Sequence, residues 1–186
     1  ANTSQCGADG STLEICNEFG VYEYYTCNGA CDAQTGFCAN PTGDICLDTI
    51  KVNDVATGTT MVPTTYSYTG TLFSSLTNSQ TLTAANNCTA FDSANGPDAI
   101  YQVTLLPNQT IDVSQSSVDE DSVVYILTDC GDNGLSCLDG GDDTFTGGTE
   151  TATYTNTTGA NLTVFVVADS YFSSATEAFD IDITVR

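Results

Sequence analysis

The sequence contains no histidine, and only two of its 186 residues, Lys51 and Arg186, are cationic. Without imidazole, the chain cannot form a Ser-His or Cys-His nucleophile pair or a histidine-ligated zinc site. Its 24 Asp and Glu residues give a net charge of −22, so it has no cationic patch that could neutralise phosphates. We therefore expect no nucleic-acid partner, and the same charge repels anionic lipid surfaces.

Long apolar segments are also absent. The longest apolar run, Val164 to Ala168, has five residues, whereas a helix needs about 20 to span a bilayer. We therefore expect no membrane span. We expect a secreted protein, extracellular or on the cell surface. The chain begins at Ala1 without a basic, apolar leader, so in a secreted protein the signal peptide would already have been removed.

Nine cysteines are present, and their irregular spacing contains no pair of CxxC knuckles that would indicate zinc. Disulfides formed in an oxidising compartment explain them better. An odd number leaves one sulfur free, bonded to another chain or without its original partner. Cys46 with Cys88 and Cys130 with Cys137 are the expected pairs in the second part of the chain, because both pairs join segments that flank strands. The cysteines are Cys6, Cys16, Cys27, Cys31, Cys38, Cys46, Cys88, Cys130 and Cys137.

The first five cysteines lie in a segment that is rich in Gly, Asn and Asp and too short for its own apolar core. We expect disulfides to hold it as a small module over residues 1–43. The turn formers Asn40-Pro41-Thr42-Gly43 mark its end. Residues 44–186 then form the second predicted domain.

Short alternating segments dominate this second domain. Thr and Ser supply 46 of the 186 residues, and no segment of 12 or more has the apolar period of a helix. Residues 179–185 alternate as a half-buried strand, whereas 121–128 and 162–167 read as interior strands. Segments 99–105 and 109–113 flank a short turn and predict a hairpin. With 65–73 and 149–155, the pattern predicts an all-β, jelly-roll-like two-sheet β-sandwich.

The order of these segments resembles the bacterial pre-peptidase C-terminal domain. The likeness covers residues 44–186 and is carried by Gly96-Pro97-Asp98-Ala99-Ile100-Tyr101, Asp121-Ser122-Val123-Val124-Tyr125 and Phe179-Asp180-Ile181-Asp182-Ile183. The resemblance implies a jelly-roll sandwich of secreted or cell-surface proteins, of which some bind calcium or matrix polymers. The preceding segment is similar to small cysteine-rich modules of secreted bacterial proteins.

Acidic residues cluster beside one interior strand and around the Cys130–Cys137 loop, where oxygen atoms could converge on calcium. Their spacing matches no calcium-loop motif, so a solvated acidic loop is the alternative reading. The candidate calcium ligands are Asp119, Asp121, Asp129, Asp132, Asp139, Asp142 and Asp143.

Two further features concern sugars. Tyr22 with Tyr24, or Tyr66 with Tyr68, would share one face of a strand and could stack on sugar rings, or could be ordinary core or sheet-surface tyrosines. Five Asn-x-Ser/Thr triplets leave glycosylation open. They begin at Asn2, Asn87, Asn108, Asn156 and Asn161.

No pair among the acidic residues specifically indicates a catalytic site, so we expect a protein that is not an enzyme. Exposed strand edges and an odd cysteine favour an extracellular structural or adhesive protein, a surface or filament subunit that self-associates. The alternative is a carbohydrate- or matrix-binding module of a secreted hydrolase.

Overall fold

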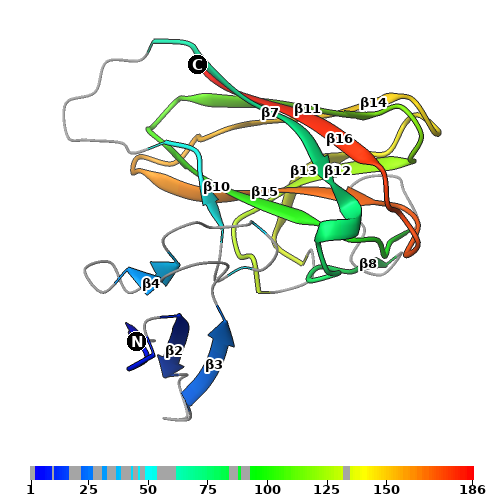
Figure 1. Ribbon diagram of the computed structural model, residues 1–186. Helices are drawn as coiled ribbons and strands as arrows, with labels where there is room; N and C mark the ends of the chain where they lie inside the picture. The colour runs from blue at the N-terminus through cyan, green and yellow to red at the C-terminus, as the bar shows by residue number, and fades with distance from the viewer. Residues whose placement is uncertain are drawn as a thin grey trace.

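Alternating apolar side chains place nine strands in two packed sheets, which form a β-sandwich (Figure 1). The computed structural model describes residues 3–9, 11–16, 22–26, 31–32, 37–38, 43, 46, 49–53, 62–83, 88, 93–131 and 135–186. One sheet contains, in spatial order, β13 (Cys137–Gly141), β12 (Ser122–Leu127), β15 (Leu162–Ser170), β10 (Ala99–Leu105) and β6 (Ile50–Lys51). The other contains β14 (Thr149–Thr155), β11 (Thr110–Ser117), β16 (Ala178–Val185) and β7 (Thr64–Leu72).

The main core lies between these two sheets. In β16, Phe179, Ile181 and Ile183 point into this core, while Asp180 and Asp182 face solvent. Successive side chains of a strand point to opposite faces, so this alternation fixes the register of the strand. The expected half-buried strand is confirmed, and so is the all-β sandwich.

A second core covers the other face of the five-stranded sheet. β12 is buried at all six positions, with Val124 and Ile126 in the first core and Val123, Tyr125 and Leu127 in the second. The covering segment includes the hairpin of β8 (Leu82–Thr83) and β9 (Ser93–Ala94). Strands buried on both faces read as continuous apolar runs, and both interior-strand predictions are confirmed.

Disulfides tie this cover to the sheet, but not in the expected pairs. Cys46 bonds Cys130 and Cys88 bonds Cys137, with Cα–Cα distances of 5.6 and 5.3 Å. The predicted pairs Cys46–Cys88 and Cys130–Cys137 are therefore wrong. Cys130 and Cys137 both contribute to the second core, where each meets a cysteine from earlier in the chain. Sequence spacing gives the length of a loop but not the direction in which its cysteine side chains point. It therefore could not predict which cysteines meet.

The predicted hairpin over residues 99–113 is also wrong, because β10 and β11 belong to different sheets. Gln109 closes the turn by donating its N–H to the Leu106 carbonyl at 3.1 Å. The buried Asn156 then receives the Asn108 N–H on its carbonyl and donates its own N–H to the Gln109 carbonyl. The chain therefore leaves the turn beside β14 rather than beside β10.

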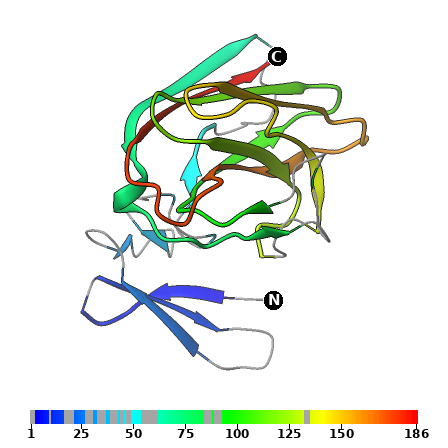
Figure 2. The same ribbon diagram turned by 90° about the vertical axis from the view of Figure 1, so that its right-hand side faces the viewer.

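The N-terminal strands form separate small sheets. β1 (Thr3–Cys6), β2 (Thr12–Cys16) and β3 (Tyr22–Thr26) make an antiparallel meander, and β4 (Cys31–Asp32) pairs with β5 (Phe37–Cys38). A Cys6–Cys31 disulfide joins the two sheets, so disulfide reinforcement of this segment is confirmed at that bond. Figure 2 shows the meander below the sandwich. Cys27 and the side chains of Cys16 and Cys38 lie outside the described part, so the odd cysteine stays a prediction.

Residue 43, where the sequence predicts the end of the first domain, lies against the sandwich. Gly43 is buried, has a φ of +77°, and accepts the Ile100 N–H at 2.6 Å. That φ is the left-handed region, which glycine adopts without a steric cost. Within the described residues, no helix has the length and hydrophobicity to cross a bilayer.

Candidate functional site

Among the described strands, β7 lies at an edge of the four-stranded sheet. Its nine residues have one described neighbouring strand, β16, and none of the nine is buried. By contrast, β11 and β16 each bury four of their eight residues. The backbone on the far side of β7 therefore has no strand partner among the described elements, which leaves a template for a further strand.

Two tyrosines lie on the inward face of this edge. Tyr66 and Tyr68 pack against the main core but stay half-exposed, and the Tyr68 ring lies 4.9 Å from the ring of the buried Tyr101. They do share one face of a strand, as the sequence predicts, and that face is the core side. The exposed side of the strand carries Thr65, Ser67 and Thr69 instead.

The C-terminal end of β7 is bent. The register with β16 shifts between Phe179 and Ile181, and Gly70, at a φ of +70°, donates its N–H to the Asp180 carboxylate at 2.7 Å. The regular part of the edge is therefore Thr64 to Tyr68, which is paired residue by residue with β16. A bulge of this kind locally disrupts the ladder and bends the strand, and pairing resumes at Thr71 and Leu72.

The opposite edge of the same sheet, β14, is closed. The Asp139 carboxylate of β13 accepts the Thr153 N–H at 2.6 Å, which fills a free edge donor of β14. Gly141 allows β13 to approach, because a Cβ there would lie 2.4 Å from the Thr151 carbonyl oxygen. The buried Glu150 carboxylate accepts the N–H groups of Asp143 and Thr144 and so fixes the connecting loop.

A hollow of about 390 Å³ opens on the solvent face of this sheet. Seven of its nine lining residues carry a hydroxyl or carboxylate group, beside Val113 and Ala152. Asp112 in this lining is paired with Arg186 and accepts a hydrogen bond from the Thr153 hydroxyl, which together hold its pKa below the usual range. The lining residues are Asp112, Val113, Ser114, Asp139, Thr151, Ala152, Thr153, Asp182 and Thr184.

Six of the seven expected calcium ligands are described, and they lie in different surroundings. Asp119 is exposed, whereas Asp121 is buried and its pKa is raised by burial and by the nearby Glu150. Asp129 accepts the Gly131 N–H in a local turn, and Asp139 contacts β14. Asp142 and Asp143 begin the loop that Glu150 holds, and Asp132 lies outside the described residues. In the described part, no three acidic or cysteine residues are grouped to hold a metal, and calcium stays a prediction.

Asn156, one of the five possible glycosylation sites, is unavailable for modification in this fold. Its side chain is fully buried and donates hydrogen bonds to the carbonyls of Leu105 and Ala160. Asn108 and Asn161 are exposed. Asn2 and Asn87 lie outside the described residues. Glycosylation at the other positions stays a prediction.

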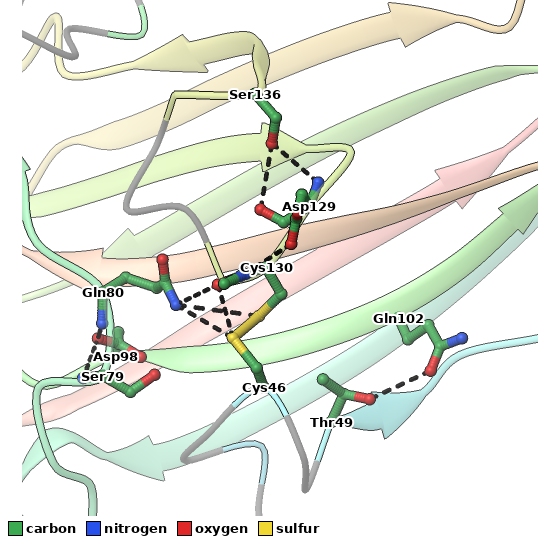
Figure 3. Close-up of a disulfide and its surroundings, with 10 residues drawn as sticks. Cys46, Thr49, Ser79, Gln80, Asp98, Gln102, Asp129, Cys130 and Ser136 are labelled. Atoms are coloured by element: carbon green, nitrogen blue, oxygen red, sulfur yellow. Dashed lines mark hydrogen bonds between the residues drawn. A yellow bond between two sulfur atoms is a disulfide. The ribbon is translucent and has the colours of Figure 1, made fainter. Parts of the chain in front are cut away.

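The second core contains a buried acidic group that sequence reasoning missed. Tyr125 donates its hydroxyl to the Asp169 carboxylate at 2.9 Å, and burial together with the neighbouring Asp98 raises the pKa of Asp169 well above its usual range. Asp98 in turn accepts the N–H groups of Ser79 and Gln80 in the cover, at 2.8 and 2.7 Å (Figure 3). Gln80 also donates to the Cys130 carbonyl beside the Cys46–Cys130 disulfide. These carboxylates therefore link the cover to the sheet.

Comparisons with known proteins give no family. No family model and no curated protein matches the chain. One similar solved structure is described as "Structural basis for the promiscuous specificity of the carbohydrate-binding modules from the beta-sandwich super family"; it shares 12% identity, covers 94% of this chain and 70% of its own, and has a TM-score of 0.27. The resemblance to the pre-peptidase C-terminal domain stays a prediction.

Proposed function

We propose that this chain is an extracellular structural protein that self-associates through β7 and does not catalyse a reaction. One observation carries the proposal: β7 is a nine-residue sandwich strand with no buried residue and one described neighbour. A second copy of β7 that pairs with it antiparallel would extend the sheet across a two-fold axis. Such pairing would supply backbone hydrogen bonds and would cover the half-exposed Tyr66 and Tyr68.

The protection of this edge is incomplete. Natural edge strands are commonly short, bulged or charged, with lysine or proline on the edge. Pro63 precedes β7 and the bulge follows Tyr68, but Thr64 to Tyr68 carries no charge and no proline. This five-residue stretch therefore has no described strand on its far side. Pro63 and the bulge would limit the register of any pairing there.

The net charge sets the conditions for association. Two copies at −22 repel each other, and the repulsion is screened over about 10 Å at 0.1 M salt. Pairing through an uncharged strand should therefore strengthen as salt rises. Two-fold pairing at a single edge gives dimers, so a filament needs a second contact, for which the N-terminal cysteine-rich segment with its odd sulfur is the candidate.

Sedimentation analysis at 0.5 M salt tests the proposal with two matched variants. Thr65 on β7 and Thr155 on β14 are both exposed, and the hydroxyl of each lies 2.8 Å from a threonine hydroxyl on the adjacent strand. We expect Thr65→Asp to weaken dimerisation about tenfold or more, because like charges would meet across the paired edge. Thr155→Asp should leave it unchanged. A wild-type protein that stays monomeric up to millimolar concentration would refute the proposal.

The hollow favours a second candidate function, the binding of a carbohydrate or matrix polymer. Its hydroxyl and carboxylate groups can hydrogen-bond sugar hydroxyls, although no aromatic side chain lines it. Asp182 is exposed at this site. If the hollow binds glycans, Asp182→Ala should weaken binding on a glycan array, while Asp180→Ala on the same strand should not. Equal binding by both variants and the wild type would place any glycan site elsewhere.

A further inference from the structure

Three loops at one end of the sandwich carry exposed apolar side chains. Val118 is 82% exposed, Phe145 is 86% exposed and Phe172 is 50% exposed. They lie in the β11–β12, β13–β14 and β15–β16 connections, which meet at the right-hand end of Figure 1. We call Val118, Phe145 and Phe172 the loop face.

The three loops are held together by Glu120. Its carboxylate accepts the N–H groups of Thr176 and Glu177, at 2.8 and 3.3 Å, and its carbonyl accepts the Gly147 N–H at 3.4 Å. These contacts join the 171–177 and 143–148 loops to the 118–121 turn. The loop face is therefore assembled before any partner arrives, which lowers the entropic cost of binding.

The two phenylalanines of the loop face lie in hydrogen-bonded turns. The Phe145 carbonyl accepts the Gly148 N–H at 2.9 Å, and the Phe172 carbonyl accepts the Ala175 N–H at 3.1 Å. The Phe172 ring also packs edge-on against Tyr171, whose centroid lies 4.9 Å away and which contacts the second core. Both exposed rings therefore belong to turns that backbone hydrogen bonds hold in place.

The charge around the loop face has one sign. Asp119, Asp143 and Glu177 are exposed in the same three loops. Neither cation of the chain lies there, since Lys51 is in β6 and Arg186 contacts Thr110 at the far end of β11. Exposed apolar and acidic side chains in neighbouring loops complement a surface that is both apolar and basic. It repels anionic lipid and a second copy of this −22 chain.

We propose that the loop face docks a polypeptide segment that carries both basic and apolar side chains. The apolar side chains would supply the buried centre of the contact, and the exposed carboxylates would supply its polar border. The loop face adjoins the C-terminal end of β7, where Phe73 and Ser74 donate their N–H groups to the Glu177 and Thr176 carbonyls, but it does not include the Thr64 to Tyr68 stretch. Docking there does not require self-association through that stretch, and either can fail without the other.

A binding experiment with synthetic peptides tests the proposal. The probe is a peptide of alternating lysine and leucine, compared with a lysine–glycine peptide of the same length and charge, at 0.15 M salt. We expect chemical-shift changes in the wild-type protein centred on residues 118–121, 143–148 and 171–177. We also expect the lysine–leucine peptide to bind about tenfold or more tightly than the lysine–glycine peptide, because only the former fills the apolar centre.

Variants separate docking from general attraction to acidic residues. Val118→Ser combined with Phe145→Ser and Phe172→Ser should weaken lysine–leucine binding about tenfold or more. Leu135→Ser, at a residue that is 75% exposed outside the loop face, should leave it unchanged. Thermal unfolding of each variant confirms that it is folded. Equal affinity for the two peptides, shifts spread over the whole acidic surface, or binding to anionic vesicles in preference to the peptide would overturn the proposal.

Discussion

At the scale of single residues, this acidic protein buries four of its carboxylate side chains. Asp98, Asp121, Glu150 and Asp169 are all buried. Three of them also accept backbone N–H groups, which compensates for part of the cost of burying a charge. Sequence patterns alone could not separate these four from the 20 other acidic residues, because burial depends on which segments of the chain pack against each of them in space.

Replacement of Asp169 by asparagine should stabilise the protein at neutral pH. The folded-state pKa of Asp169 is raised by burial and by Asp98, so the folded protein binds a proton that the unfolded chain releases above its pKa of about 3.9. This contribution to stability is complete below about pH 4 and is lost as the pH rises through the folded-state pKa. We expect Asp169→Asn to raise the free energy of unfolding by roughly 1 kcal/mol or more at pH 7, with a smaller gain at pH 4.

Urea unfolding with disulfides intact measures this difference at both pH values. Asp182→Asn is the control, since Asp182 is exposed on β16, and it should change stability by less than about 0.5 kcal/mol. A difference between Asp169→Asn and the wild type that is the same at pH 4 and pH 7 would contradict this account of the buried carboxylate.

At the scale of strands, the period of two in the sequence predicted where strands lie but not which strands pair. Segments 121–128, 162–167 and 179–185 are strands with the expected burial. The predicted 99–113 hairpin was wrong because a short turn can return the chain either along the strand it left or into the opposite sheet. The position of β7 at a sheet edge could also not be predicted from the sequence, because it depends on which strands are neighbours in space. The sequence signal that was available is that residues 64–72 carry no charge.

The closure of the β14 edge depends on a single glycine. We expect Gly141→Ala to lower the free energy of unfolding by about 1–3 kcal/mol, because the added Cβ would lie 2.4 Å from the Thr151 carbonyl oxygen and would push β13 away. Gly159→Ala is the matched control, because a Cβ there meets nothing within 4 Å, and its effect should stay within about 0.5 kcal/mol. Chemical denaturation of both variants provides the comparison, and equal stabilities would show that β13 and β14 do not need this close approach.

At the scale of the whole molecule, three layers give the sandwich one closed face and one open face. The cover and its two disulfides close the outer face of the five-stranded sheet. The outer face of the four-stranded sheet carries exposed polar residues such as Thr151 and Asp182, and Figure 2 shows the two sheets packed together. Composition predicted the sandwich and its cross-links. It could not predict the cover, whose buried residues Leu82 and Ala94 come from a segment without a clear alternating pattern.

Self-association through β7 is the central claim, and amide hydrogen exchange as a function of protein concentration tests it most directly. At 0.5 M salt, the account predicts that exchange within residues 64–68 slows as the concentration rises from micromolar to millimolar. Exchange within β14, residues 149–155, should not change. Unchanged exchange in residues 64–68 across that range, or slowing confined to other segments, would contradict the claim.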